Sequence, residues 1–291
     1  MDYKNSFVPG GIIDFNIIMG VARSRISRAN TFSLLCLESI KDFSERDIVR
    51  TENPDSRVSY KIEICKNESF NEVKDNYLSW ALNSAFREMF EGFIVFLNYV
   101  YLATLNINNH GRKLNVEEVN LMFEGFEKFN KGLVRPKDKI KILSELGINV
   151  FLDNNKDFRI FEGLKDVRDC LAHSLGIMNE EYGNSVKGDK SLRNIKWKSL
   201  RMYQFKENKK IKIKKGRLVE YPEKMEVNTE EYKKNFKIGE YISFESHEIL
   251  EIGLTLDNYV TYIGNQIIKL ARDKGVKFID EENQKEKELV E

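Results

Sequence analysis

Cysteine, histidine and proline are scarce in this chain: among 291 residues there are three cysteines, three histidines and four prolines. The cysteines, Cys36, Cys65 and Cys170, form no close pair and no spacing typical of metal ligands. Their scarcity argues against a disulfide framework and a zinc site, and it favours a reducing cytosol. The sequence also contains no P-loop and no glycine-rich dinucleotide-binding pattern. We therefore expect a cytoplasmic protein that binds no metal ion and no cofactor.

Net charge and long apolar runs are lacking as well. The formal net charge is +1, so any attraction to a charged partner must come from a local cluster. The most apolar run, residues 93–105, contains Asn98 and is shorter than the roughly 20 residues that span a bilayer. Residues 11–22 are interrupted by Asp14 and Asn16 and follow no basic region, which argues against a signal peptide. We expect a soluble protein with no membrane segment.

Apolar and aromatic residues at helical spacing are abundant. Hydrophobic residues make up 41% of the chain, with 19 Phe and 12 Tyr, which is enough to form a large core. Apolar periodicity predicts helices over residues 12–45, 71–106, 116–130, 137–146, 161–175 and 247–274. We expect the first of these helices to break near residues 28–30.

Two predicted helices each carry an aromatic stripe that is expected to face the core. In residues 71–106, the expected central helix, the stripe consists of Trp80, Phe86, Phe90, Phe93 and Leu97. In residues 116–130 it consists of Phe123, Phe126 and Phe129.

Alternating apolar and polar residues predict a smaller amount of β-structure. Short strands are expected at residues 58–62 and 241–244, and residues 195–198 and 211–214 predict a β-hairpin with its turn near Glu207-Asn208. We thus expect a mainly α fold: a helical bundle over residues 1–176 and, packed on the same domain, the hairpin and a C-terminal helix over residues 177–279. The charged tail, residues 280–291, is expected to be disordered.

The expected hairpin lies in the most basic part of the chain. Residues 187–217 hold 13 Lys or Arg against Asp189 and Glu207, a local excess of 11 positive charges. Such a surface attracts RNA phosphates, and Trp197 and Tyr203 offer rings for stacking on unpaired bases. The residues expected to bind RNA are Lys196, Trp197, Lys198, Arg201, Lys210, Lys212 and Lys214. The alternative is an edge hairpin whose lysines only prevent aggregation.

Residues 161–177 combine a polar set with an apolar helical stripe, which consists of Leu164, Val167 and Leu171. Arg168, Asp169 and His173 lie off the stripe, and Gly176 is placed to end the helix. At about 100° per residue, Asp169 and His173 lie about 40° apart, so the carboxylate can orient the imidazole. Arg168 and His173 lie about 140° apart. They converge only if the helix ends or bends near His173, or if a second chain supplies one of them.

The pattern Arg168-Asp169-x-x-x-His173 resembles the Arg-x4–6-His signature of the HEPN superfamily, small helical domains that are commonly metal-independent RNases in toxin and antiviral systems. The resemblance implies a HEPN-like helical bundle with endoribonuclease activity, in which Arg168, Asp169 and His173 are catalytic. It also implies a homodimer with two motifs facing each other, and RNA products with 2′,3′-cyclic phosphate and 5′-hydroxyl ends. Since unrestrained cleavage would harm the host, a regulatory partner or antitoxin is expected.

Two other functions stay open at this level. One is a non-catalytic HEPN-like module that binds RNA or a nucleotide, or that acts as a dimerising scaffold. The other is an interaction protein in which Arg168 and His173 only satisfy local carbonyls and carboxylates. Burial of the two motif side chains, or a monomer with no facing motif, would favour the non-catalytic module.

Overall fold

The structure is a computed structural model that describes residues 6–7, 13–42, 69–131, 134–153, 155–206, 209–213 and 224–277. This part of the chain holds six helices and a four-stranded antiparallel sheet, with 62% helix and 18% strand, so the expected mainly helical class is confirmed. The helices are α1 (Phe15–Asp42), α3 (Phe70–Asn108), α4 (Val116–Asn130), α5 (Pro136–Glu145), α6 (Lys156–His173) and α7 (Ser246–Asp273). The sheet comprises β3 (Asn184–Val186), β4 (Asp189–Lys206), β5 (Lys209–Lys212) and β6 (Lys224–Lys237). The short strands β1 (Ser6–Phe7) and β2 (Leu114–Asn115) pair separately.

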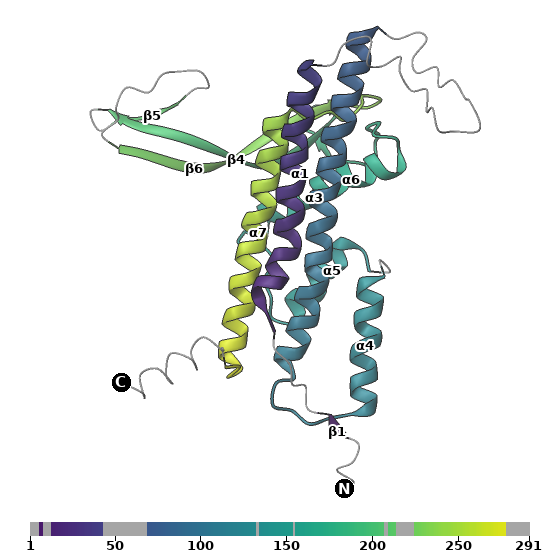
Figure 1. The fold of residues 1–291 in the computed structure, drawn as a ribbon, viewed down its shortest axis with the longest axis vertical. Coiled ribbons are helices and arrows are strands. Elements are labelled where there is room, and N and C mark those ends of the chain that lie inside the picture. Colours follow the sequence, from purple (N-terminus) through teal and green to yellow (C-terminus); the bar gives the residue numbers. More distant parts are fainter. Residues whose placement is uncertain are drawn as a thin grey trace, which may run out of the picture.

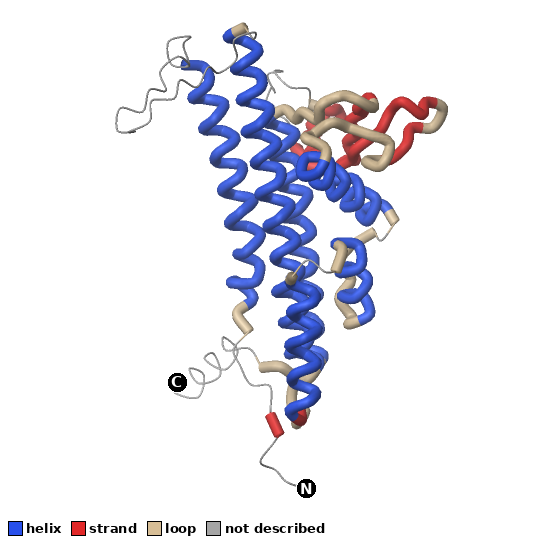
Figure 2. The backbone as a smooth tube through the Cα atoms, turned by 90° about the vertical axis from the view of Figure 1, so that its right-hand side faces the viewer, coloured by secondary structure: helices blue, strands red, loops and turns tan. Residues whose placement is uncertain are grey.

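Three long helices, α1, α3 and α7, lie side by side and form the body of the molecule (Figure 1, Figure 2). A capping box begins α3, because the Ser69 side chain accepts a hydrogen bond from the Glu72 N–H while the Glu72 side chain accepts one from the Ser69 N–H. From there α3 buries a phenylalanine face that is 0% exposed and consists of Phe86, Phe90, Phe93 and Phe96. α7 approaches α1 closely at Gly264, where a Cβ atom would lie 2.6 Å from the Met19 Sδ.

α6 and the first half of β4 complete the core. Phe161 of α6 packs on Phe90 and Phe93 of α3, with ring centroids 5.6 and 6.1 Å apart. Ile195 and Trp197 of β4 are fully buried in the same apolar cluster. The position of α6, and therefore of its polar residues, is set by this aromatic contact with α3.

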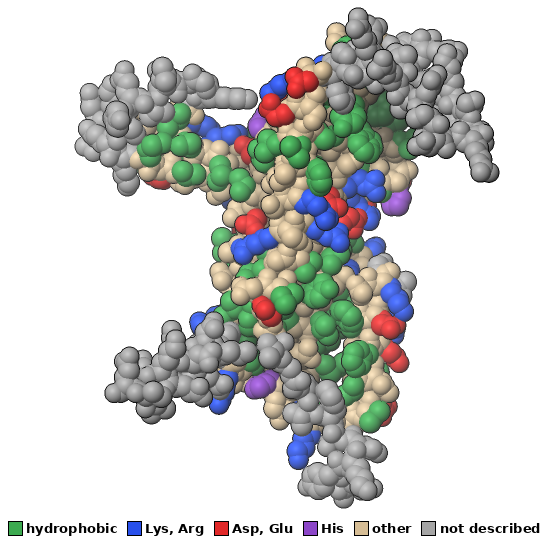
Figure 3. Space-filling view, viewed as in Figure 1, with side chains coloured by type: hydrophobic (Ala, Val, Ile, Leu, Met, Phe, Trp, Pro, Cys, Tyr) green, Lys and Arg blue, Asp and Glu red, His purple; other side chains and the backbone are tan. Residues whose placement is uncertain are grey.

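β4 extends beyond the core into an arm formed by residues 200–206, 209–212 and 224–229. β4 pairs with β6 from Leu192–Lys237 to Phe205–Lys224, and it pairs with β5 only near its end. Figure 1 shows the arm reaching away from the helices. One face of the arm is apolar, and Figure 3 shows hydrophobic side chains gathered on it. The exposed members, 41–57% accessible, are Leu200, Met202, Met225 and Val227.

The predicted helices over residues 71–106, 116–130, 137–146, 161–175 and 247–274 are confirmed, with ends shifted by a few residues. The break expected near residues 28–30 is wrong, because α1 is one continuous helix. Ion pairs hold this helix to both neighbours: Arg28 pairs with Glu88 of α3, and Arg23 pairs with Asp257 of α7 at 2.9 Å. Arg28, within the expected break, is thus used in a lateral contact.

The two expected aromatic stripes are only partly buried. Trp80 is 66% exposed and Phe123 is 62% exposed. Each lies six residues before a buried phenylalanine, Phe86 or Phe129, and six residues turn a helix by about 240°, onto another face. The aromatic residues of the sequence therefore predicted a wider buried face on each helix than the structure shows.

The β-structure departs from the sequence prediction in its register. The connection between Lys206 and Lys209 is two residues long, so residues 211–212 reach back only to Gln204 and Tyr203. Residues 195–198 pair instead with residues 231–234 of β6. The strand expected at residues 241–244 is wrong, since only Tyr241 there forms a bridge, to Ile177. The strand expected at residues 58–62 and the tail, residues 280–291, lie outside the described residues.

α3 has the length and composition of a membrane-spanning helix, with a mean hydropathy of 1.4 over 18 residues. However, 56% of that window is buried inside the bundle, and the core helix of a soluble protein has the same properties. The length and hydropathy of α3 are therefore only weak evidence for a membrane-spanning helix.

Replacing Phe93 by alanine is expected to lower the free energy of unfolding by about 3–5 kcal/mol, because it opens a cavity in a close-packed aromatic core. Trp80→Ala is the control, since it removes a larger ring from an exposed position of the same helix and is expected to cost less than about 1 kcal/mol. Urea unfolding followed by circular dichroism measures both values. Equal losses in the two variants would contradict the assignment of the buried face of α3.

Candidate functional site

α6 carries the Arg-x4-His motif and ends at it. His173 is the last helical residue, and the N–H groups of Ser174 and Gly176 both donate to the Cys170 carbonyl, at 2.9 and 3.1 Å. Leu175 and Gly176 have φ values of +53° and +79°, the left-handed conformation that ends helices. The predicted helix end next to Gly176 is confirmed, and it leaves His173 exposed in the last turn.

Arg168 is held against α3 by Glu91 and also pairs with Asp169 of its own helix. Its Nε donates to Glu91 at 2.6 Å and its Nη1 donates to Asp169 at 2.9 Å, while about a third of the side chain stays exposed. Burial works against the charge, but the hydrogen bonds to Asp169 and Glu91 outweigh it and raise the pKa of Arg168. The contacts use at most three of the five guanidinium N–H groups, which leaves donors for a phosphate.

Asp169 does not orient His173 as the helical angles predicted. Its two carboxylate oxygens accept from Arg168, at 2.9 Å, and from the Lys165 ammonium, at 3.0 Å. Lys165 lies four residues before Asp169, the same separation as His173 on the other side, and its full charge makes it the stronger partner. Within the described residues His173 makes no hydrogen bond and no ion pair. Because α6 stays helical through His173, this side chain and Arg168 leave the helix about 140° apart.

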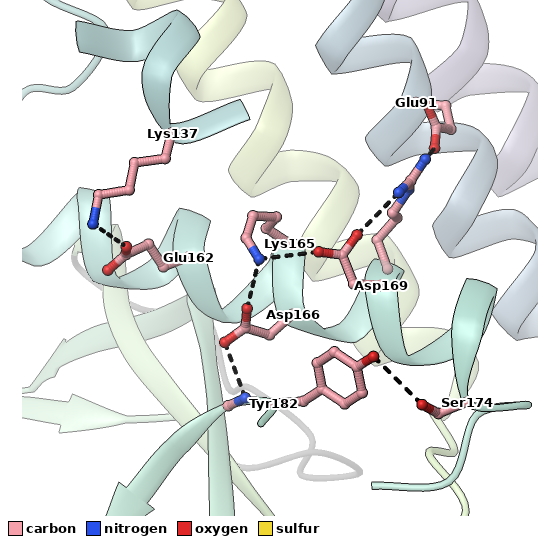
Figure 4. A network of polar contacts seen from close by, with 10 residues as sticks. Glu91, Lys137, Glu162, Lys165, Asp166, Asp169, Ser174 and Tyr182 are labelled. Carbon is pink, nitrogen blue, oxygen red and sulfur yellow. Dashed lines mark hydrogen bonds and ion pairs between the residues drawn. The ribbon is translucent and has the colours of Figure 1, made fainter. Parts of the chain in front are cut away.

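The motif belongs to a polar network along a half-buried side of α6 (Figure 4). Lys165 bridges Asp169 and Asp166, at 3.0 and 2.9 Å, and Asp166 accepts a hydrogen bond from the Gly183 N–H at 3.0 Å. Together with Arg168 and Glu91, the network contains two cations and three carboxylates, a net charge of −1. The motif alone is therefore not an electrostatic attractor for a polyanion.

Nucleophilic and metal chemistry have little support near the motif. Burial raises the pKa of the Cys170 thiol to about 11, so this thiol is protonated and unreactive at neutral pH. Over the described parts of the chain, no group of three or more His, Cys, Asp or Glu residues is close enough to hold a metal ion.

The basic residues expected to bind RNA are paired with carboxylates that lie elsewhere in the sequence. These ion pairs, between 2.6 and 3.2 Å, are Lys196–Glu231, Lys198–Asp157, Arg201–Glu251, Lys210–Glu226 and Lys212–Glu230. Lys214 lies outside the described residues. Five of the 13 basic residues counted over residues 187–217 are thus paired with carboxylates of β6, α6 and α7, which the sequence segment alone did not show.

The prediction that Trp197 binds RNA is wrong. The side chain is 0% exposed, and its Nε1 donates to Glu251 of α7 at 2.9 Å. Its ring lies 4.8 Å from the ring of Tyr232 on β6. A fully buried indole cannot stack on a base, so in this fold Trp197 joins the sheet to α7.

Sequence reasoning missed part of the surroundings of these residues. Glu91 had been weighed as a possible neighbour of the motif, with a plain surface ion pair favoured, and it is the partner of Arg168. Lys187 had been counted in the basic segment and Lys196 had been expected to bind RNA, but Arg159 and Lys233, which line a cavity with them, were missed. No sequence signal links these four, because they come from three elements and a turn that only the fold brings together.

Replacing Glu251 by glutamine is expected to destabilise the protein by about 1–3 kcal/mol, because hydrogen bonds from Trp197, Ser199 and Arg201 lose their charged acceptor. Glu230→Gln, which removes one exposed pair with Lys212, is the control and is expected to cost less than about 1 kcal/mol. Chemical unfolding of both variants measures the difference. A smaller loss in Glu251→Gln than in the control would contradict the joint between the sheet and α7.

The chain was compared with protein-family models, curated proteins and solved structures, and none of them matches it. The resemblance to the HEPN superfamily is therefore carried by Arg168, Asp169 and His173 and the helix that holds them. Function must follow from the chemistry of the side chains that the fold brings together.

Proposed function

We propose that this protein is a cytoplasmic, metal-independent endoribonuclease of the HEPN type, active as a homodimer, with Arg168 and His173 as its catalytic residues. The observation that carries the proposal is the state of His173. Its side chain is exposed at the end of α6 and has no partner among the described residues. Histidine is the side chain most often used for proton transfer in catalysis, and an exposed one is accessible to a substrate.

The chemistry assigns each group a role. His173 of one chain takes the proton of an RNA 2′-hydroxyl, whose oxygen then attacks the adjacent phosphorus. The bond from phosphorus to the 5′-oxygen breaks, and a second, protonated histidine gives its proton to that oxygen. Arg168 stabilises the negatively charged phosphorane through the N–H groups that Glu91 and Asp169 leave unused. Asp169 positions Arg168, and the products carry 2′,3′-cyclic phosphate and 5′-hydroxyl ends.

A second copy of the chain supplies the second histidine. One chain has a single His173, and Arg168 and His173 leave α6 on different faces. Leu175, two residues beyond the motif, supports an interface at this point because it is 86% exposed. A leucine with positive φ at the surface combines backbone strain with exposed apolar area, and a partner chain would cover that area.

Control of this activity belongs to the same proposal. Cleavage of cellular RNA without restraint harms the cell that makes the enzyme. A toxin or antiviral effector therefore requires a regulatory partner or antitoxin, as the HEPN resemblance implies.

A non-catalytic HEPN-like module that binds RNA or a nucleotide, or acts as a dimerising scaffold, is the second candidate. It is favoured by the net charge of −1 in the network around Arg168, where two carboxylates already occupy the guanidinium. This function predicts RNA or nucleotide binding without cleavage.

Incubation of the purified protein with total RNA in EDTA tests the first proposal. Wild type is expected to cleave, and His173→Ala and Arg168→Ala are each expected to lose at least about 100-fold in rate, because a proton-transfer group or the phosphorane-binding cation is removed. His247→Ala is the matched control, since His247 is an exposed histidine at the start of α7. Mapping of the RNA ends identifies the products.

Two outcomes would reject the ribonuclease proposal. Undiminished cleavage by the His173 and Arg168 variants would place the activity elsewhere. RNA binding without cleavage by wild type would favour the non-catalytic module.

A substitution of Leu175 tests the proposed dimer interface. Leu175→Asn is expected to convert the dimer to a monomer and to reduce cleavage together with it, because a polar side chain replaces the exposed leucine. Asparagine tolerates positive φ, so the fold of each chain is expected to be unchanged. Light scattering after size-exclusion chromatography measures the mass. A wild-type monomer, or a variant that stays dimeric, would contradict this interface.

A further inference from the structure

A cavity of about 330 Å³ lies where α6 meets the sheet, away from the Arg-x4-His motif. Its polar lining consists mainly of Arg159 of α6, Ser185 and Lys187 at the end of β3, Asn194 and Lys196 of β4, and Lys233 of β6. This volume is within the range of about 300–1,000 Å³ that is typical of small-molecule sites. The cavity is thus large enough for a ligand, and its lining defines the chemistry of that ligand.

The charge of the lining is strongly one-sided. Four basic side chains surround the cavity, and none of the described residues that line it is acidic. Lys196 pairs with Glu231 at 2.6 Å, whereas Arg159, Lys187 and Lys233 form no ion pair with the described residues. Lys210 and Lys212 of the arm differ from these three, since each pairs with a carboxylate. Three basic side chains without a described carboxylate partner therefore meet at this cavity, which favours an anionic ligand.

The pairing of β4 with β6 gives a second reason to expect an anionic ligand at the cavity. Lys196 and Lys233 are directly opposite each other across the ladder of β4 and β6. Like charges at directly opposite positions destabilise a sheet. A bound anion would remove this repulsion.

Asn194 contributes a buried polar side chain to the wall of the cavity. The residue is 5% exposed, and its Nδ2 donates to the carbonyl of Asn184, another lining residue, at 3.1 Å. This contact joins β4 to β3 beside the basic side chains and fixes that part of the wall.

We propose that this cavity binds the phosphate group of a nucleotide unit, held by Arg159, Lys187 and Lys233. The phosphate comes from a free nucleotide or from a nucleotide within an RNA chain. The site is separate from the motif, because nine residues along α6 place Arg159 about 180° around the helix from Arg168 and about 14 Å along it. It does not depend on the ribonuclease proposal.

Isothermal titration calorimetry of the full-length protein tests this site with three probes. These are a nucleoside 5′-monophosphate, the same nucleoside without phosphate, and an RNA octamer without terminal phosphates. The RNA measurement uses His173→Ala protein, so that cleavage cannot remove the probe. Lys233→Gln and Arg159→Gln are each expected to weaken binding about tenfold, through loss of a charged contact to phosphate. Lys269→Gln, an exposed lysine of α7 outside the cavity, is the matched control and is expected to bind like wild type.

Binding of the monophosphate but not of the nucleoside, weakened by Lys233→Gln, would identify a free nucleotide as the phosphate source. Binding of the octamer alone, weakened by the same substitution, would identify RNA as the source. The proposal is overturned if no probe binds, or if Lys233→Gln and Lys269→Gln bind equally well. Lys233 is exposed and unpaired, so unchanged thermal unfolding is expected to show that the variant is folded. If the protein did not cleave RNA, the ribonuclease proposal would fail but the binding result would stand, because the binding test substitutes residues outside the Arg-x4-His motif.

Discussion

The packing of α6 against the phenylalanine face of α3 is the contact on which the candidate sites depend. Phe161 contacts both Phe90 and Phe93, and Arg168, two turns later on the same helix, meets Glu91 on the same stretch of α3. The aromatic contact therefore sets where the guanidinium lies and how much of it stays exposed. The other side of α6 meets the sheet and forms one wall of the basic cavity.

Charge pairing separates basic residues that are close in the sequence. Lys198, Arg201, Lys210 and Lys212 meet carboxylates of β6, α6 and α7, so they stabilise the fold locally and attract anions weakly. Arg159, Lys187 and Lys233, around the cavity, have no such partner in the described structure. Their charge is therefore not offset by a neighbouring carboxylate. The net charge of the chain, +1, does not show this difference.

Particular elements show how far sequence reasoning reached. Helical periodicity located α3 to α7, and the glycine after His173 located the end of α6, because both are local properties of the chain. Local reasoning was wrong for Trp80 and Phe123, since a stripe drifts around a helix and only the packed partner shows which part is covered. It was wrong for Trp197, because the face of a strand that meets α7 depends on contacts 54 residues away in the sequence.

By itself, the sequence determined the helical class and the helix positions, which follow from the periodicity of apolar residues and from local backbone preference. It also determined the spacing of Arg168, Asp169 and His173 along one helix. The tertiary structure decided which charges are paired. It joined Arg168 to Glu91, paired five residues of the basic segment with distant carboxylates, and gathered Arg159, Lys187, Lys196 and Lys233 around one cavity. The physical reason is that electrostatic interactions depend on distance in space, and residues 159 to 233 approach one another only after the core has formed.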